Sequence, residues 1–369
     1  MITPLKFERV TARGLRNLHP TELDFSPALN VFVGDNGQGK TSLLEGLCVA
    51  ATGRSFRTDQ ISEVIQNGSA GLSVSAQVND DGLCREQSVT IGTKGRQVFI
   101  DGKRVASMAA YATHTPIVVF FPDDLDLVTG AAATRRSLLD RIALYTNPIS
   151  QEWRLAYVRA LRHRQRLLEK SGDYAKALHA FEAIIVEQGL NYARAHAEAA
   201  QSLCQHLTEI FDVLCAHLLS LEVTFAGVEL ASAEAYREEL VKRRANDRHR
   251  KRPSLGPHRD DMHLSLGGRS ARHHASQGQQ RLLALAIKLA ELKCIQVARQ
   301  AHPILLLDDV VSELDLQRTA SVFEWLRDTE CQVFLSTPRQ DVISALAMTK
   351  KEQRNFSVED GQIQHNSCS

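Results

Sequence analysis

The feature that most constrains this chain is a glycine-rich loop near its N-terminus. The apolar run Leu29–Gly34 precedes the loop and the helix-favouring run Thr41–Ala51 follows it. The loop fits the pattern G-x-x-x-x-G-K-[ST] through Gly34, Asp35, Asn36, Gly37, Gln38, Gly39, Lys40 and Thr41. Glycines let backbone N–H groups curl around phosphate groups, and the N-terminus of the next helix adds a favourable dipole. A strand, this loop and a helix in succession predict an α/β fold around a nucleotide site.

Individual side chains of the predicted site have distinct expected roles. Lys40 would reach the β- and γ-phosphates, and the hydroxyl group of Thr41 would hold Mg²⁺. The run Ile304–Leu307 predicts a buried strand that ends in Asp308. A carboxylate at that tip lies at the nucleotide crevice, where it can hold Mg²⁺ through water. Asp309 follows, where a base can polarise the attacking water, so we expect ATP and Mg²⁺ as cofactors.

A second helix start also has the features of an anion site. Ser276 is a plausible N-cap for an apolar helix over residues 276–300. The same helix start, with Gly278 and Gln279, can instead bind phosphate, because the N-terminal end of a helix is electropositive. The chain already has one phosphate loop of its own. A second such helix end therefore predicts a nucleotide presented by another copy of the chain, with a simple helix cap as the alternative.

Together and in this order, these motifs resemble those of the SMC-like family of ABC-type ATPases, in particular its bacterial recombination mediators. Other segments that carry the resemblance are Leu15–Asn17, Gly53–Arg57, Arg135–Asp140, Gly256–Asp261 and Ser312–Asp315. The resemblance covers residues 5–360, which is nearly the whole chain. It implies an α/β ABC-ATPase head, a P-loop NTPase, with an inserted helical lobe. It also implies that Arg16 lies near the phosphates.

The resemblance further implies a mode of action. Two copies would form a homodimer on ATP binding, with Ser276, Gly278 and Gln279 of each copy on the nucleotide of the other. The ATP-bound dimer would bind DNA, single-stranded or gapped, in recombinational repair and replication. It would support induction of the SOS response, and the recombination mediator RecR would be a partner.

Departures from the broader ABC pattern imply slow hydrolysis. Asp309 replaces the usual glutamate, Ser336–Thr337 stands where a switch histidine is expected, and Phe121–Leu125 contains no glutamine. Each loss removes a group that orients water or Mg²⁺, and general-base help is worth roughly 10²–10⁴-fold in rate. We therefore expect a weak ATPase that acts as a timed switch.

The character of the sequence changes along the chain and predicts two lobes. Strand-like runs dominate residues 1–125, whereas residues 126–254 favour helices of about 25 residues, which suit a compact lobe or short hairpin arms. Leu155, Val158, Leu161 and Gln165 trace one stripe at helical spacing, and Leu203, Leu207, Ile210 and Leu214 trace another. We expect an ATP-binding head built from residues 1–125 and 255–369, with a mainly helical lobe over 126–254.

Charge distribution says more about partners than the net charge of +1. Lys242–Arg252 has seven basic residues against one acid. A second basic stretch comprises Arg154, Arg159, Arg162, Arg164 and Arg166. Both favour a DNA-binding surface apart from the nucleotide motifs, with a solvated helix face or loop as the alternative. Because aromatic residues make up only 6% of the chain, contact with phosphates should dominate over stacking on bases.

Two other functions remain open. The nucleotide subunit of an ABC transporter is disfavoured, because it predicts a switch histidine and a Q-loop glutamine that this chain lacks. An ATP-binding scaffold that recruits repair proteins and touches DNA weakly is not excluded by the sequence. Retention of the protein on DNA with and without ATP would separate the scaffold from the switch.

Composition predicts a cytoplasmic protein with no membrane partner. The seven cysteines occur singly, without a C-x-x-C pair, as is typical of a reducing compartment. No apolar run approaches the roughly 18–20 residues that a membrane-spanning helix needs. Met1–Val10 has no apolar core of a secretory signal.

Overall fold

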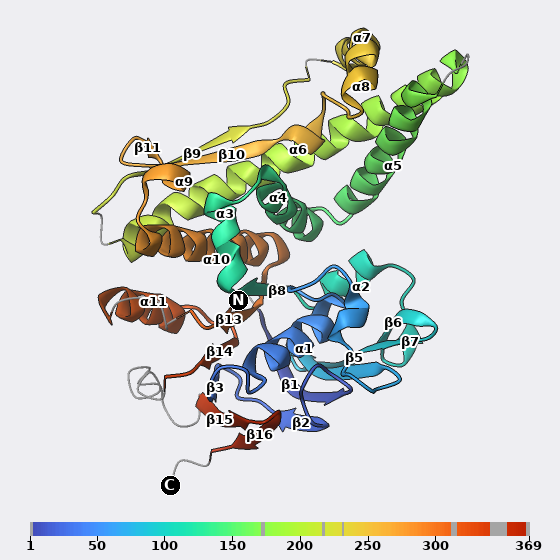
Figure 1. Ribbon diagram of the computed structural model, residues 1–369. Helices are drawn as coiled ribbons and strands as arrows, with labels where there is room; N and C mark the ends of the chain where they lie inside the picture. Colours follow the sequence, from blue (N-terminus) through green and yellow to red (C-terminus); the bar gives the residue numbers. More distant parts are fainter. Residues whose placement is uncertain are drawn as a thin grey trace. The chain divides into compact units, whose positions relative to one another are not determined.

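The chain forms two compact units in the computed structural model (Figure 1), which describes residues 3–170, 174–215, 218–230, 232–310, 316–339 and 353–366. Unit 1 comprises Met1–Leu125, Ile210–Leu218 and Ser276–Ser369. Unit 2 comprises Asp126–Glu209 and Leu219–Ala275. The chain thus returns to unit 1 later than the expected lobe boundary at residue 255. The reason is that strand β10 (Asp261–Leu266) pairs along its length with β9 (Leu221–Ala226) in unit 2.

Unit 1 contains a mostly parallel sheet with the strand order β16-β15-β3-β14-β13-β8. Its strands are β3 (Leu29–Val33), β8 (Ile117–Phe120), β13 (Ile304–Asp308), β14 (Val333–Thr337), β15 (Gln353–Glu359) and β16 (Gln362–His365). Only the β15–β16 pair is antiparallel among these described strands. Every residue of β3, β8, β13 and β14 is buried, and strands covered on both faces need such continuous apolar runs. The predicted α/β fold is confirmed.

A second, mainly antiparallel sheet in unit 1 has the order β12-β1-β4-β5-β6-β7, with β2 paired to β1. Its strands are β1 (Thr3–Arg13), β2 (Thr21–Asp24), β4 (Leu72–Asp80), β5 (Leu83–Gly92), β6 (Gly95–Ile100), β7 (Lys103–Arg104) and β12 (Ala301–His302). Alternate residues of β4 are buried, as expected for a strand with one face on the core. The strand-like runs noted in residues 1–125 thus form most of this sheet.

Helix α1 (Lys40–Thr52) joins the two sheets of unit 1 into one core. It contacts β4 and β5 of the antiparallel sheet and β8, β13 and β14 of the parallel sheet, and most of its residues are buried. The other helices of unit 1 are η1 (Ile61–Val64), α2 (Met108–His114), η2 (Pro122–Leu125), α10 (Gln277–Arg299) and α11 (Leu316–Asp328). The helix predicted over residues 276–300 is thereby confirmed.

Unit 2 combines helices with a small antiparallel sheet in the order β11-β10-β9. Its helices are α3 (Asp126–Thr129), α4 (Ala132–Thr146), α5 (Ser150–Glu169), α6 (Ala175–Leu214, whose last turn belongs to unit 1), α7 (Ala233–Lys242), α8 (Arg244–Arg250), η3 (Pro257–Arg259) and α9 (Ala271–His274). Strand β11 is Arg269–Ser270. The expected helix length of about 25 residues was wrong for α6, which has 40 residues and is about 60 Å long.

The reason for this length lies in the sequence of α6. It has no proline, and the added Cβ at its interior Gly189 would lie 3.1 Å from the rings of Tyr157 and Tyr236, so the glycine permits close packing instead of a helix end. The stripe Leu203, Leu207, Ile210 and Leu214 is buried as predicted. The α5 stripe was wrong at Leu155, which is 52% exposed, because Tyr157, Ala160, Leu161 and Arg164 form the buried face instead.

Among the described residues, no helix combines the length and apolarity that crossing a membrane requires.

Candidate functional site

The phosphate loop connects β3 to α1 and is shaped by close backbone contacts. Gly39 precedes α1 with φ 115°, a left-handed conformation that glycine adopts without a Cβ penalty. A Cβ at Gly34 would lie 2.1 Å from the carbonyl oxygen of Val358, so the loop begins where β15 leaves no room for a side chain. The Nζ group of Lys40 donates to the carbonyl oxygens of Gly34 (2.6 Å) and Asp35 (2.8 Å). The lysine is therefore already held inside the loop.

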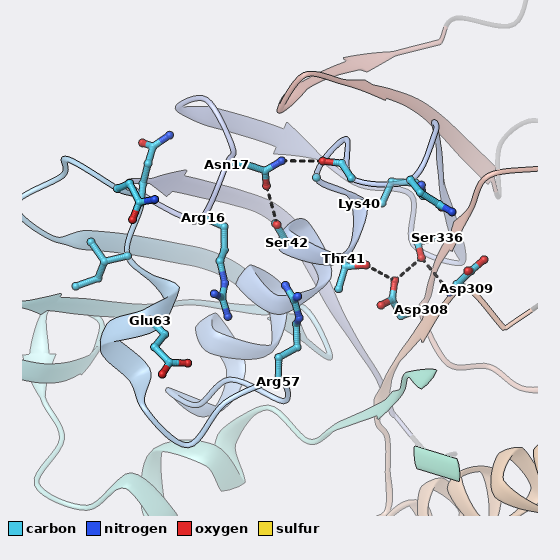
Figure 2. A pocket seen from close by; sticks show the side chains of 16 residues that line it. Arg16, Asn17, Lys40, Thr41, Ser42, Arg57, Glu63, Asp308, Asp309 and Ser336 are labelled. Atoms are coloured by element: carbon cyan, nitrogen blue, oxygen red, sulfur yellow. Dashed lines mark hydrogen bonds between the residues drawn. The ribbon is translucent and has the colours of Figure 1, made fainter. Parts of the chain in front are cut away.

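Two residues that sequence reasoning did not assign to the loop, Asn17 and Gly361, hold its shape. The Nδ2 group of Asn17 donates to the carbonyl oxygen of Gly37 (3.1 Å), and its Oδ1 accepts from the hydroxyl group of Ser42 (2.8 Å). Figure 2 shows both bonds. The backbone of Gln38 accepts from the N–H group of Gly361 (2.9 Å), in the turn between β15 and β16. Because these partners are distant in sequence from the loop, no local pattern could have revealed them.

Oxygen atoms suited to Mg²⁺ gather where α1, β13 and β14 meet (Figure 2). The Oδ1 atom of Asp308 accepts from the hydroxyl groups of Thr41 (3.0 Å) and Ser336 (2.6 Å). Burial raises the pKa of Asp308, against the opposing effect of these two hydrogen bonds. Carboxylate and hydroxyl oxygens beside a phosphate loop are the donor set that Mg²⁺ takes in phosphoryl-transfer sites. The residues present therefore fit this metal, and Ser336 is a member of the cluster that the sequence did not single out as a contact.

Asp309 has an unusual backbone conformation. Its φ of 54° lies in the left-handed region, which is strained for a residue with a side chain. Its N–H group donates to the carbonyl oxygen (3.2 Å) and the hydroxyl group (3.1 Å) of Ser336, and these bonds hold the turn at the end of β13. The strain places the carboxylate of Asp309 in the same pocket as Lys40 and Asp308.

The pocket in front of the loop has a volume of about 720 Å³. The predicted site residues that line it are Arg16, Asn36, Gly37, Gly39, Lys40, Thr41, Asp308 and Asp309. Gly34, Asp35 and Gln38, the other residues of the loop, are not among those that line the pocket. Burial lowers the pKa of Lys40, although Asp309, Asp308 and Asp35 oppose this by favouring its charged form. The structure thus brings Lys40 together with the carboxyl groups of Asp308 and Asp309 in a pocket of nucleotide size.

Arg16 lines this pocket but is bound to a carboxylate of its own chain. Its Nε and NH2 groups donate to the two oxygens of Glu45, each at 2.8 Å. Glu45 is fully buried in α1 and also accepts from the hydroxyl group of Ser55 (2.6 Å) and from Arg57 (3.5 Å). The buried carboxylate therefore orients Arg16 and Arg57 toward one side of the pocket (Figure 2). The role of Arg16 toward phosphates stays a prediction.

The predicted signature residues at the start of α10 form a reciprocal helix cap. The hydroxyl group of Ser276 accepts from the N–H group of Gln279 (3.3 Å), and Oε1 of Gln279 accepts from the N–H group of Ser276 (2.8 Å). Ser276 is exposed, and neither it nor Gly278 and Gln279 lines the nucleotide pocket of its own chain. Their role on the nucleotide of a second copy stays a prediction. The segment Ser312–Asp315 lies outside the described residues.

In the two basic segments, some cations form ion pairs within the chain and others are exposed at the surface; Lys242 does both. The paired cations have Asp140, Glu182, Asp247 or Glu239 as partners and are Arg154, Arg164, Lys242, Arg243 and Arg244. The other exposed cations are Arg159, Arg162, Arg166, Arg248, Arg250, Lys251 and Arg252. Spacing alone does not distinguish the two groups, because the pairing acids come from other helices or lie one turn away.

Comparisons with known proteins agree with this geometry. The family model described as "RecF/RecN/SMC N terminal domain" matches residues 6–362. The DNA replication and repair protein RecF of Myxococcus xanthus (strain DK1622) is 38% identical over 343 residues, which is 90% of each chain. The protein of the same name from Geotalea daltonii is 31% identical and covers 98% of this chain and 100% of its own.

Solved structures also resemble this chain. The recombination mediator RecF with ATP, in the RecFOR pathway, has a TM-score of 0.88 at 25% identity and covers 98% of both chains. An Smc head domain from Pyrococcus furiosus has a TM-score of 0.58 at 17% identity, covers 99% of this chain and 96% of its own, and supports the fold alone. The chain therefore belongs to the RecF family, whose fold is that of the SMC-like ABC-ATPase heads.

Proposed function

We propose that this protein is an ATP-controlled DNA-binding switch of recombinational repair and replication. The observation that carries the proposal is the arrangement of Lys40, Thr41 and Asp308 around one pocket at the phosphate loop. The hydrogen bonds of Lys40 to its own loop and of Thr41 to the carboxylate of Asp308 support this proposal, because phosphoryl-transfer sites combine a phosphate-binding lysine with hydroxyl and carboxylate groups that hold Mg²⁺. Its relatives are named for DNA replication and repair, and one solved relative is named as bound to ATP.

The residues of the pocket would divide the work on ATP as follows. Backbone N–H groups of the loop and the charge of Lys40 bind the phosphates. A bound Mg²⁺ would neutralise charge that builds on the phosphates, and Thr41 and Asp308 would hold it. Asp309 would orient the attacking water. Ser336 donates to Asp308 and supports the backbone of Asp309, so it positions both carboxyl groups.

Slow turnover follows from the residues at the end of the strands. The aspartate side chain of Asp309 is one methylene group shorter than glutamate, and it depends on a strained backbone for its placement. Ser336 lies on β14 beside it, and a hydroxyl group is a weaker proton acceptor than imidazole at neutral pH. We therefore propose a weak ATPase in which hydrolysis ends the ATP-bound state.

The ATP-bound state is proposed to be a homodimer that binds single-stranded or gapped DNA. Two features support this: the exposed, self-capped signature at Ser276, and the absence of that signature from the pocket of its own chain. The name of the RecFOR pathway in the solved relatives supports RecR as a partner. A cytoplasmic location and support of SOS induction belong to the same proposal.

The test is DNA binding with and without nucleotide. Fluorescence anisotropy of labelled gapped DNA should show tighter binding with Mg·ATP than without it. Lys40→Ala should lose both ATP binding and this ATP-dependent gain, whereas the exposed Lys94→Ala, which removes the same charge outside the pocket, should behave as wild type. Equal binding to DNA with and without ATP would replace the switch with the scaffold alternative.

A further inference from the structure

Two stretches of unit 2 gather several exposed cations and contain no acidic residue. On α5 they are Arg159, Arg162 and Arg166, and residues 153–168 include neither aspartate nor glutamate. A spacing of three and four residues places these arginines on one face of the helix, opposite its buried face. The second stretch begins in the last turn of α8, and its exposed cations are Arg248, Arg250, Lys251 and Arg252.

Buried ion pairs fix α8 against α5 and α6. Arg164 of α5 is fully buried, and it donates to Asp247 of α8 (2.6 Å), to Glu182 of α6 (3.0 Å) and to the carbonyl oxygen of Leu240 (2.7 Å). Arg244 of α8 also pairs with Glu182. Every part of this network is satisfied by a partner in unit 2, so α8 is held rigidly on the helix pair. The backbone of α5 and α8 that carries the exposed cations is consequently held in place by these pairs.

Members of both sets of cations lie close in the chain to the contact between α5 and α8. The Nε2 group of Gln165 donates to the carbonyl oxygen of Asp247 (3.2 Å), which marks the contact line. Arg162 lies one turn before Gln165 on α5, and Arg166 is the next residue after it. Arg248 directly follows Asp247 on α8. Figure 1 shows α8 beside the α5–α6 pair. Arg162, Arg166 and Arg248 therefore lie within one helical turn of residues that make this contact. The seven exposed cations of the two stretches are together called the basic surface.

We propose that this basic surface, made by Arg159, Arg162, Arg166, Arg248, Arg250, Lys251 and Arg252, binds the phosphate backbone of DNA. The inference rests on the proposed function and assigns the place on unit 2 where DNA is held. Like charges on neighbouring helices repel one another, and a polyanion relieves that repulsion while it releases counterions. Six of the seven cations are arginines, whose planar guanidinium groups match phosphate oxygens in pairs.

The chemistry of the surface favours a nucleic acid over an acidic protein. Protein interfaces are anchored by clusters of aromatic or aliphatic side chains at their centre. On α5 and α8, the large apolar side chain that is strongly exposed is Leu155, at the N-terminal end of the arginine stripe, and single exposed leucines are ordinary on protein surfaces. The ring of His163 is stacked on Phe181 of its own chain, which leaves that face of the ring unavailable to a base. Binding should therefore depend on phosphate charge and little on base sequence.

Three variants test the surface. The α5 variant carries Arg159→Gln, Arg162→Gln and Arg166→Gln, and the α8 variant carries Arg248→Gln, Arg250→Gln, Lys251→Gln and Arg252→Gln. The control variant removes four exposed positive charges from unit 1, through Arg13→Gln, Lys94→Gln, Lys103→Gln and Arg104→Gln. The α8 and control variants have the same net charge, so they separate a local contact from the overall field. Circular dichroism during thermal unfolding establishes that each variant keeps the fold.

DNA affinity is measured at several salt concentrations with excess ATP, on labelled duplex and single-stranded DNA. The slope of log affinity against log salt should fall in the α5 and α8 variants. For each phosphate that the variant no longer neutralises, the expected decrease is about 0.9 on duplex DNA and about 0.7 on single strands. The control variant should keep the wild-type slope. Polyglutamate of the same length as the single strand should compete weakly.

Different outcomes would contradict the proposed DNA-binding role of this surface and the proposed function on which that role rests. If wild type binds DNA in an ATP-dependent way but the α5 and α8 variants keep its slope, DNA binds elsewhere and the switch still stands. If the salt slope of the control variant falls as much as that of the α8 variant, the proposed role of the surface is also contradicted, because net charge alone would then explain the effect. If polyglutamate displaces labelled DNA as strongly as unlabelled DNA does, the surface would bind an acidic protein instead of DNA. No DNA binding by wild type under any nucleotide condition overturns both proposals.

Discussion

At the scale of single residues, neighbouring side chains with the same charge have different tasks. Asp308 and Asp309 are adjacent in the chain, yet Asp308 ends a buried strand and accepts two hydroxyl hydrogen bonds, while Asp309 occupies a strained left-handed turn. Arg162 and Arg164 are two residues apart on α5, and one is exposed whereas the other is fully buried among carboxylates. Substitutions at each pair should therefore have effects of different kinds.

Replacement of Asp308 and of Asp309 by asparagine, one at a time, should separate the effect on metal binding from the effect on water activation. Asp308→Asn removes a charge from the proposed Mg²⁺ site, so binding of Mg·ATP should weaken by about tenfold or more, and hydrolysis should fall with it. Asp309→Asn should leave ATP affinity near that of wild type and slow hydrolysis by about 10²–10⁴-fold. Nucleotide titration and single-turnover phosphate release measure the two effects. Unchanged hydrolysis in Asp309→Asn would remove the role assigned to that carboxylate.

Substitutions of Arg164 and of Arg162 should differ in their effect on the stability of the fold. Arg164→Leu leaves the buried carboxyl groups of Glu182 and Asp247 without a shared cation, and loss of one partner of a buried ion pair costs about 3–5 kcal/mol in the free energy of unfolding. Arg162→Gln changes an exposed side chain and should shift this free energy by less than about 0.5 kcal/mol. Urea unfolding followed by circular dichroism compares them. Equal stability of the two variants would show that the buried network is dispensable.

At the scale of elements, the long helix α6 organises unit 2 through buried polar contacts as well as apolar ones. His196 of α6 is fully buried, with Nδ1 3.0 Å from a carboxylate oxygen of Asp260 and Nε2 3.2 Å from one of Asp140 on α4. Tyr192, one turn earlier, also donates to Asp140 (2.8 Å). One face of α6 thereby joins α4 to the segment that leads into β10.

This arrangement predicts a pH-dependent contribution to the stability of unit 2. Burial lowers the pKa of His196, but hydrogen bonds to Asp140 and Asp260 outweigh it and raise the pKa above its ordinary value of 6.5. The folded state then binds this proton more tightly than the unfolded state. The stabilisation is fully present below about pH 6.5 and is lost as pH rises through the raised pKa.

The variant His196→Gln measures this contribution. The difference in free energy of unfolding between wild type and His196→Gln should be largest near pH 6 and should shrink toward pH 9. His249→Gln, at an exposed position of α8, serves as the control and should give no such trend. A difference that stays constant from pH 6 to pH 9 would mean that His196 is buried in its neutral form.

At the scale of the whole molecule, the phosphate loop and the signature helix belong to the same unit but not to the same pocket. Each provides a helix N-terminus with backbone donors, and Ser276 in the isolated chain uses its hydroxyl group to cap its own helix. A nucleotide from a second copy would give this exposed helix end an anion. The proposed dimer would thus contain two sites, each made from both copies.

Complementation between two defective chains tests this composite site. Ser276→Arg places a bulky cation where a phosphate should meet a hydroxyl group, so the variant should bind ATP, remain monomeric and lose hydrolysis. Lys40→Ala should fail to bind ATP but keep an intact signature. A mixture can assemble one site with an intact Lys40 from one chain and an intact Ser276 from the other, and we expect partial recovery of ATPase activity. Ser276→Gly, which removes the hydroxyl group without adding bulk, is the control that should still dimerise.

Sedimentation with and without ATP follows dimer formation in the same samples. If Ser276→Arg alone still dimerises with ATP and hydrolyses it, the helix start at Ser276 is a cap and has no role on a nucleotide.

What the sequence by itself determined are the features encoded over a few consecutive residues. The phosphate loop is one of these, because its glycines, its lysine and the flanking strand and helix are contiguous. The strand that ends in Asp308 is another, since a strand buried on both faces requires an unbroken apolar run. The signature helix and its N-cap at Ser276 were predictable for the same reason.

The tertiary structure alone decided which distant groups complete these features. Asn17, Gly361 and Ser336 hold the loop or its carboxylates through contacts across 20 residues or more of chain, and no local spacing encodes such contacts. It also decided that Arg164 is a buried structural residue while Arg162 stays exposed, because the carboxylates that neutralise Arg164 come from α6 and α8. Local patterns specify which element a residue joins, whereas burial and charge pairing depend on what folds against it.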